Sequence, residues 1–554
     1  MENTSQLSLN KSISKFYRIF RLDRKDISSI YIFALLAGLV QLSLPLGIQT
    51  IISFVMAGSV STSIVVLILM VLIGTFLNGL LQVRQLQVIE KLKQKIFLRY
   101  SMEFSRRLPH LDIEKLDKYY LPELVNRYFD TFSLQNGIEK LLIDFPSAII
   151  QIILGLTLLS FYHSIFIGFG VLLILILFLI LRATSPRALS LAVKSSDYKY
   201  EVASWLQETA RLVKSFKYAK GKSLQLTKTD ALVTGYLESR TEFFKVLILQ
   251  FWSLISFKMV ITAAMLIVGT ILLVNQQINV GQFIAADIVI IAIMNSVEKL
   301  IISLDKVYEG LVSVEKLAKV AEAPVEENGT IKMIDNGKGM GIEFSAVSFG
   351  YGGLDNVIEN LSFTIKPGEI VHIKGDSGSG KSTILRLLTG SFHNYNGSVL
   401  VDGLPISNYE LDSLRSQTGV LLSSQDIFSG TLHENISFGN EAVTVDEIMA
   451  LAKQTGLDQF IQSSQDGLNT HLDPVGKRLP RHLRLRILLM RALLGKQRLL
   501  LLEEPFQYLD PVSKDQVIRL MNQGEKLTVL IASEDDMLPE YCDQVILLKN
   551  HVKN

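Results

Sequence analysis

Six long apolar stretches dominate the first part of the chain. Each is close to the roughly 20 residues that a helix needs to cross a bilayer. They lie near residues 29–56, 62–83, 143–161, 164–182, 246–274 and 282–304. Short loops join them into three pairs, at Ala57–Ser61, His163–Ser164 and Asn275–Gly281. The pattern predicts an all-α transmembrane domain with six helices.

Positive charge separates the loops of this domain into two kinds. The three short loops contain neither Lys nor Arg, whereas the two long connections carry runs of both, between Arg84 and Arg127 and between Arg187 and Lys228. Positively charged loops stay on the cytoplasmic side of a membrane. We therefore expect both long connections and both termini to face the cytoplasm.

The long connections alternate apolar and charged residues near the helical period, over Gln85–Phe104 and Tyr198–Phe216. They predict long cytoplasmic helices that extend the membrane helices, although simple solvated connectors would show the same periodicity. The middle parts of the connections, Asp112 to Arg127 and Tyr200 to Val213, are expected to contact the domain that follows.

A polar stretch with glycines, Pro324 to Gly341, follows the last long helix and predicts a domain boundary. We assign residues 1–323 to the transmembrane domain, 324–340 to a linker and 341–554 to a second domain. Short β-rich runs alternate there with helical ones, which is typical of an α/β fold. The runs are Ile342–Phe349, Leu361–Ile365, Ile370–Ile373, Leu499–Leu502 and Thr528–Ala532.

Composition supports an integral membrane protein, since 49% of the 554 residues are hydrophobic and only 19% are charged. A formal net charge of +2 argues against nucleic acid as a partner. The single cysteine, Cys542, excludes an intramolecular disulfide. The polar N-terminus predicts no cleaved signal peptide, and Ile13–Phe20 predicts a short amphipathic helix at the membrane surface.

A glycine-rich motif lies between an apolar strand, Ile370–Ile373, and a predicted helix, Thr383–Leu388. Its glycines allow backbone N–H groups to surround phosphate oxygens, while its lysine supplies charge to the β- and γ-phosphates and its serine hydroxyl binds Mg²⁺. The motif predicts a P-loop that binds ATP. It consists of Gly375, Asp376, Ser377, Gly378, Ser379, Gly380, Lys381, Ser382 and Thr383.

A second apolar strand, Leu499–Leu502, ends in two carboxylates, Glu503 and Glu504. P-loop ATPases place a metal-binding and a water-polarising carboxylate at such a position. The sequence therefore predicts Ser382 and Glu503 as Mg²⁺ ligands and Glu504 as the catalytic residue.

With these motifs the chain resembles the ATP-binding-cassette (ABC) exporters over almost its whole length. The resemblance rests on Val347-Ser348-Phe349-Gly350-Tyr351, Val401-Asp402-Gly403, Leu414-Arg415, Phe428-Ser429-Gly430-Thr431-Leu432, Glu434-Asn435-Ile436, Arg491-Ala492-Leu493-Leu494 and Leu509-Asp510. It implies an α/β P-loop ABC ATPase domain, called the cassette below, on the cytoplasmic side of a bacterial inner or plasma membrane. It also implies that Tyr351 stacks on adenine.

The same resemblance exposes departures from the family pattern. Leu479-Pro480-Arg481-His482-Leu483, named here the signature segment, occupies the position of the family's Leu-Ser-Gly-Gly-Gln. Ser423 replaces the family's glutamine in the loop that senses the membrane domain, and Ser533 replaces its switch histidine. Glu503 replaces an aspartate. These changes predict a degenerate cassette that binds ATP but hydrolyses it poorly.

Two functions follow as hypotheses. The chain is either one half of an exporter, similar to peptidase-less bacteriocin, type I secretion, multidrug or lipid exporters, or a regulatory membrane subunit that binds ATP without hydrolysing it. The resemblance implies membrane lipids as its surroundings and a dimer with an identical or different half-transporter, and it allows a periplasmic adaptor and an outer-membrane channel. Within the spans, Asp287 is a functional candidate, and Lys258 and Glu298 are expected to form an ion pair.

Overall fold

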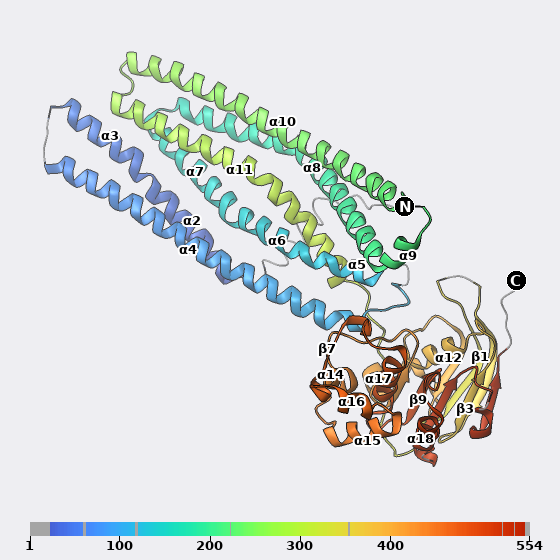
Figure 1. The fold of residues 1–554 in the computed structure, drawn as a ribbon. Coiled ribbons are helices and arrows are strands. Elements are labelled where there is room, and N and C mark those ends of the chain that lie inside the picture. Colours follow the sequence, from blue (N-terminus) through green and yellow to red (C-terminus); the bar gives the residue numbers. More distant parts are fainter. Residues whose placement is uncertain are drawn as a thin grey trace. The chain divides into compact units, whose positions relative to one another are not determined.

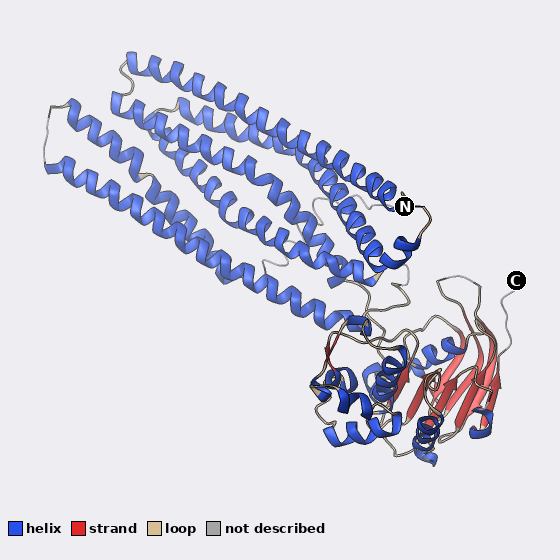
Figure 2. Ribbon diagram, viewed as in Figure 1, coloured by secondary structure: helices blue, strands red, loops and turns tan. Residues whose placement is uncertain are grey.

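The computed structural model describes residue 21 and residues 23–58, 62–116, 120–221, 223–352, 355–522, 524–536 and 538–548. The amphipathic helix predicted at Ile13–Phe20 lies outside these residues. The chain divides into two compact units. One is helical, and the other combines helices and strands (Figure 2).

The helical unit contains six stretches of helix that are long and apolar enough to cross a membrane, as the sequence predicts. Four of them extend far beyond the apolar segment, which confirms the long helices predicted in the connections (Figure 1). The helices of this unit are α2 (Arg24–Gln41), α3 (Ser43–Met56), α4 (Thr62–Arg107), α5 (Leu121–Val125), α6 (Asp130–Glu139), α7 (Phe145–Tyr162), α8 (Ile165–Arg211), α9 (Val213–Tyr218), α10 (Leu224–Val274) and α11 (Val280–Ala321).

Prolines explain two interruptions that the apolar pattern alone does not predict. The first span is broken at Leu42, between α2 and α3, because Pro45 has no N–H to donate to the carbonyl of Gln41. A π-helical turn, Lys140–Asp144, precedes α7, whose second residue is Pro146. The predicted helix Tyr198–Phe216 is divided between α8, which ends at Arg211, and α9, which begins at Val213.

Within this unit, α2 packs along α4, α8 along α10, and α11 along α6 and α7. Helix α11 is the most buried of the six spans. Lys258 on α10 and Glu298 on α11 form the predicted ion pair, with Nζ and Oε2 3.2 Å apart. Asp287 on α11 is half-buried.

The second unit contains two main sheets. A four-stranded antiparallel sheet has the order β2-β1-β4-β5, and a five-stranded parallel sheet has the order β11-β3-β10-β9-β6. Strands β7 and β8 pair separately. The strands are β1 (Ile342–Phe349), β2 (Ile358–Ile365), β3 (Ile370–Lys374), β4 (Asn396–Val401), β5 (Leu404–Pro405), β6 (Thr418–Leu421), β7 (Gly430–Thr431), β8 (His471–Leu472), β9 (Leu499–Glu503), β10 (Thr528–Ala532) and β11 (Gln544–Leu547).

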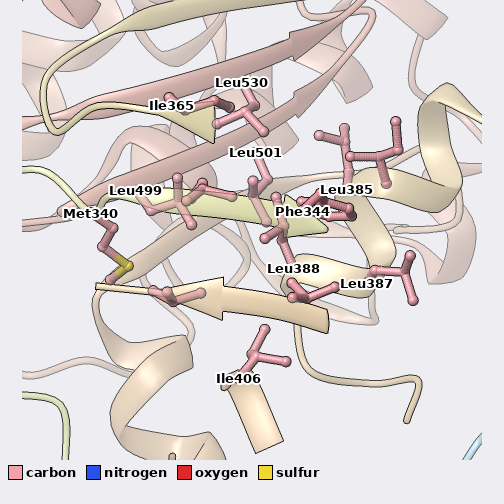
Figure 3. Packing of buried hydrophobic residues seen from close by; sticks show 14 of the residues in the cluster. Met340, Phe344, Ile365, Leu385, Leu387, Leu388, Ile406, Leu499, Leu501 and Leu530 are labelled. Carbon is pink, nitrogen blue, oxygen red and sulfur yellow. The ribbon is translucent and has the colours of Figure 1, made fainter. Parts of the chain in front are cut away.

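Both faces of the parallel sheet are covered, as the continuous apolar run in β9 requires. Leu499 and Leu501 pack with α12 and the antiparallel sheet (Figure 3), while Leu500 and Leu502 pack with α14, α15, α17 and α18. The helices are α12 (Lys381–Leu388), α13 (Leu411–Ser416), α14 (Leu432–Ser437), α15 (Val445–Thr455), α16 (Asp458–Ser463), α17 (Arg481–Leu493) and α18 (Pro511–Met521).

The short segment that begins at His110, between α4 and α5, belongs to this second unit. Leu111 bridges to Val325, and the Glu114 carboxylate accepts hydrogen bonds from the backbone N–H groups of His393 (2.9 Å) and Asn394 (3.3 Å). The first long connection therefore carries a segment that packs on the cassette. In the second connection α9 ends at Tyr218 and α10 begins at Leu224, so the chain turns back after the predicted Tyr200 to Val213 segment.

Candidate functional site

The parallel strands β3, β10 and β9 end side by side, and the predicted site residues lie at or just after their carboxyl ends. In the register of β10, Ala532 pairs with Ile373 of β3 on one side and with Glu503 of β9 on the other. The segments that leave these strands are therefore neighbours. Ligands of open α/β sheets bind at such carboxyl ends of strands.

The P-loop connects β3 to α12, as the sequence predicts. Gly378 and Gly380 have φ angles of +85° and +92°, a region that favours glycine. At Gly375, an added Cβ would lie 2.6 Å from the Ser379 hydroxyl, so side-chain bulk is excluded there. That hydroxyl is buried and has no hydrogen-bond partner within the described part of the chain. A tight loop that presents backbone N–H groups and an unpaired hydroxyl is suited to bind an anionic ligand.

The Lys381 side chain folds back across this loop. Its ammonium donates hydrogen bonds to the carbonyl oxygens of Gly375 (2.5 Å) and Asp376 (3.0 Å). It also contacts the carboxylate of Glu534, at 3.3 Å. Only 11% of the Lys381 side chain is exposed. The charge is therefore held inside the loop.

Glu503 joins the P-loop to the loop after β6. One of its carboxylate oxygens accepts a hydrogen bond from the Ser382 hydroxyl (2.6 Å), and the other accepts one from the backbone N–H of Ser423 (2.7 Å). The structure thus brings together Ser382 and Glu503, the two predicted metal ligands. A hydroxyl beside a carboxylate is a suitable protein contribution to a Mg²⁺ site, because Mg²⁺ takes oxygen ligands and usually shares them with phosphates.

Glu504 lies next to the end of β10. Its φ of +45° is unusual for a residue with a side chain. The carboxylate accepts hydrogen bonds from the Ser533 hydroxyl (2.8 Å) and from the backbone N–H of Glu534 (2.9 Å). Ser533 therefore contacts the predicted catalytic carboxylate directly.

Tyr351 lies beside the P-loop helix. Its hydroxyl forms a hydrogen bond with the Thr383 hydroxyl (3.1 Å) and accepts one from Arg386 (3.3 Å). Its ring meets those of Phe349 and Phe392 edge to face. The predicted adenine-stacking residue is thus close to the P-loop and anchored at its hydroxyl.

The signature segment lies at the start of α17. Pro480 is the N-cap residue of this helix, and it makes no side-chain hydrogen bond to the free N–H groups of the first turn. Arg481 and His482 are exposed, whereas Leu479 and Leu483 pack partly against the core beneath. The helix therefore begins with bulky side chains at its surface.

Sequence reasoning missed two contacts of this site. One is the Glu534 carboxylate on Lys381, and the other is His372, a fully buried residue of β3 whose Nε2 lies 3.0 Å from the Ser533 carbonyl oxygen. The acidic run Glu534-Asp535-Asp536 after a buried strand was the available signal. Its partners became visible only through the parallel pairing of β3 with β10.

Two families match this chain. Residues 27–297 match the ABC transporter transmembrane region, and residues 358–507 match the ABC transporter family. The first match covers most of the helical unit, and the second contains the P-loop, the signature segment and the two carboxylates at the end of β9, Glu503 and Glu504.

Relatives and a solved structure extend the likeness. A Rickettsia felis protein named for export ATP-binding and permease roles is 26% identical over 76% of this chain and 74% of its own length. An ATP-dependent lipid A-core flippase from Pseudoalteromonas atlantica is 24% identical over 84% of this chain and 78% of its own. The structure of a bacterial Atm1-family ABC exporter with ATP bound shares the fold, with a TM-score of 0.85 and 19% identity over 95% of this chain and 93% of the other.

Proposed function

Because the chain belongs to the ABC transporter family, as an integral membrane half-transporter with a cytoplasmic ATPase domain, we propose that it is an asymmetric half. In this proposal its own P-loop binds MgATP, while its signature segment cannot complete a second chain's ATP site. The single observation that carries the proposal is Pro480 at the N-cap of α17, followed by two exposed bulky side chains.

The P-loop side supports ATP binding. Residues Gly375 to Thr383 would surround the phosphates, Lys381 would neutralise their charge, and Tyr351 would stack on the adenine. Ser382 and Glu503 would hold Mg²⁺ from the adjacent positions that they already occupy. Glu504 would polarise the attacking water. Bound Mg²⁺ would neutralise charge that develops on the transferred phosphoryl group.

The signature side supports slow hydrolysis. In the family this segment faces the partner's ATP, where a serine hydroxyl and glycine N–H groups contact the γ-phosphate. Pro480 offers neither a hydroxyl nor an N–H, and the side chains of Arg481 and His482 obstruct close approach of the backbone. Loss of one preorganised donor typically lowers a rate by about a hundred- to a thousandfold.

Half-transporters of this family act as dimers, so the partner decides which sites work. Two copies of this chain would place the signature segment against both nucleotides. A partner with an intact signature would complete the site at Lys381 and Glu504, while the partner's own P-loop would still face the degenerate segment. We therefore propose one competent site in such a heterodimer. Co-purification would test a periplasmic adaptor and an outer-membrane channel as further partners.

We also propose boundaries for the domains of the chain. Residues 1–323 would form the transmembrane domain, 324–340 the linker and 341–554 the cassette. The linker is anchored at Glu326, whose carboxylate forms a two-pronged ion pair with Arg415 (2.6 and 2.7 Å). Such bidentate pairs are among the stronger charge-assisted interactions.

Steady-state phosphate release by the purified homodimer tests the proposal. We expect turnover no faster than that of Glu504→Gln, and an increase of about a hundredfold after Pro480→Ser, Arg481→Gly, His482→Gly and Leu483→Gln are combined. The matched control changes the same four residues to alanine, which removes bulk without restoring the hydroxyl. Turnover of several per second by the unmodified homodimer would contradict the proposal.

A further inference from the structure

The segment that follows β10, Ser533 to Asp536, is acidic and contacts the P-loop. Three consecutive carboxylates, Glu534, Asp535 and Asp536, follow the buried Ser533. In the family pattern the position of Ser533 holds a histidine. The segment therefore places carboxylates close to the position that the phosphates of a nucleotide would occupy.

The segment is anchored independently of Glu534. The backbone N–H of Ser533 donates to the carbonyl of Ile373, and the ring of His372 contacts the Ser533 carbonyl oxygen. Lys514 pairs with Asp535, and Lys374 pairs with Asp536, each at 2.5 Å. The position of the Glu534 backbone is thus fixed by residues on both sides of it.

From this position the Glu534 side chain reaches Lys381. The Lys381 ammonium has three N–H donors, and its three neighbours are two loop carbonyls and the Glu534 carboxylate. A phosphate that approaches Lys381 must compete with that carboxylate. The Glu534 carboxylate contacts this loop through the Lys381 ammonium, whereas phosphates nearer the nucleoside would meet the backbone of the loop.

The segment provides few free hydrogen-bond donors for a γ-phosphate. The Ser533 hydroxyl and the Glu534 N–H both donate to the carboxylate of Glu504. A γ-phosphate would therefore meet carboxylates where the family provides a histidine donor. Like charges at short range disfavour each other.

We propose that Glu534 is a specificity-determining residue of the nucleotide site: it occupies Lys381 and thereby favours nucleoside diphosphate over nucleoside triphosphate. The inference rests on the proposed P-loop site for ATP, and it adds a preference that the P-loop motif does not contain. Most of the Glu534 side chain, 61%, is exposed, so water screens the pair and the preference is modest.

The test compares Glu534→Gln with Asp536→Asn in the full-length protein in nanodiscs. Asp536→Asn removes the same charge two residues away, from a pair with Lys374 rather than Lys381. Dissociation constants for ADP and for a non-hydrolysable ATP analogue are measured by equilibrium dialysis with Mg²⁺. The analogue makes the result independent of whether the protein hydrolyses ATP.

We expect Glu534→Gln to tighten binding of the triphosphate analogue about two- to fivefold, and binding of ADP by a smaller factor, because Lys381 would contact the β-phosphate of both but the γ-phosphate of the triphosphate alone. Asp536→Asn should leave the ratio of the two constants at its wild-type value. An unchanged ratio in Glu534→Gln, or an equal change in Asp536→Asn, overturns the inference while the P-loop site stands. Failure of the unmodified protein to bind either nucleotide would overturn both.

Discussion

The P-loop side and the signature side of the cassette differ in how the fold holds their functional groups. On the P-loop side, Lys381, Ser382, Glu503 and Glu504 each have at least one hydrogen-bond or ionic partner. They follow the buried strands of the parallel sheet. On the signature side, the first residues of α17 lie at the surface, and the N-cap residue, Pro480, makes no capping hydrogen bond.

This difference supports the proposal that the signature segment can diverge at little cost to folding, whereas the P-loop side keeps its loop and departs from the family pattern at Ser423, Glu503 and Ser533. Groups at the ends of β3, β9 and β10 are positioned by strands that are buried on both faces, so a change there also disturbs the core. Exposed residues of a first helical turn contribute little to folding. We therefore expect substitutions in the signature segment to affect chemistry more than folding.

The largest effect that would test the comparison is the loss of nucleotide binding. We expect Lys381→Ala to abolish stabilisation of the protein by ATP, because the substitution removes the charge inside the P-loop. At an ATP concentration about a hundred times the dissociation constant, this stabilisation is about 2.7 kcal/mol. The measurement is the shift of the thermal unfolding midpoint on addition of MgATP.

Lys366→Ala provides the control, because Lys366 is an exposed lysine in the turn between β2 and β3. It should leave the ATP-induced shift unchanged. An undiminished shift in Lys381→Ala would show that nucleotide binds elsewhere, and the contrast between the two sides would then lose its basis.

A second effect, of comparable size, concerns folding itself. Leu501 in β9 is fully buried, on the face of the parallel sheet that packs against α12 and the antiparallel sheet. We expect Leu501→Ala to cost about 2–5 kcal/mol of the free energy of unfolding, through lost burial and the cavity that remains. Arg481→Ala, at the surface of α17, should change that free energy by no more than about 0.5 kcal/mol.

Hydrogen-exchange mass spectrometry of the full-length protein measures both effects locally. The amides of β9 and β10 should lose protection in Leu501→Ala and keep it in Arg481→Ala. Comparable losses in the two variants would mean that the signature side is as important to the fold as the strands are, which would remove our explanation for its divergence.

The sequence predicted most of the architecture because the relevant signals are local. Apolar runs of bilayer length located the six spans, and β1 and β10 have the predicted bounds. The P-loop was found from consecutive residues between a strand and a helix. Each of these features depends on side chains that are close together in the chain.

The contacts that sequence reasoning missed are nonlocal. Glu534 reaches Lys381 only because β10 pairs with β3 in one particular register, and no pattern near either residue specifies that register. The pair between Glu326 and Arg415 likewise joins the linker to the helix α13. The break at Leu42 is different, since Pro45 was a local signal that the apolar run concealed.

The smallest effect we predict contrasts two helix N-termini of the cassette. At α18 the Asp510 carboxylate caps the helix, accepting hydrogen bonds from the backbone N–H of Ser513 (2.9 Å) and from its hydroxyl (2.7 Å). At α17 the corresponding residue is Pro480, which cannot cap. We expect Asp510→Ala to cost about 1 kcal/mol at neutral pH and to expose the first turn of α18 to hydrogen exchange.

The pH dependence of that cost identifies its cause. The hydrogen bonds from Ser513 hold the pKa of Asp510 below its usual value. A carboxyl whose pKa is lowered by folding stabilises the protein above its unfolded pKa, about 3.9, and the contribution disappears as the pH falls through the lower folded value. The difference between the unmodified protein and Asp510→Ala should therefore stay constant from about pH 6 to 8 and shrink below about pH 4. Asp510→Asn, which keeps an acceptor oxygen, should lose less than the alanine variant and show little of this pH dependence. If Asp510→Ala lost no protection relative to the unmodified protein at neutral pH, the cap would contribute nothing, and the N-termini of α17 and α18 would not differ in the way proposed.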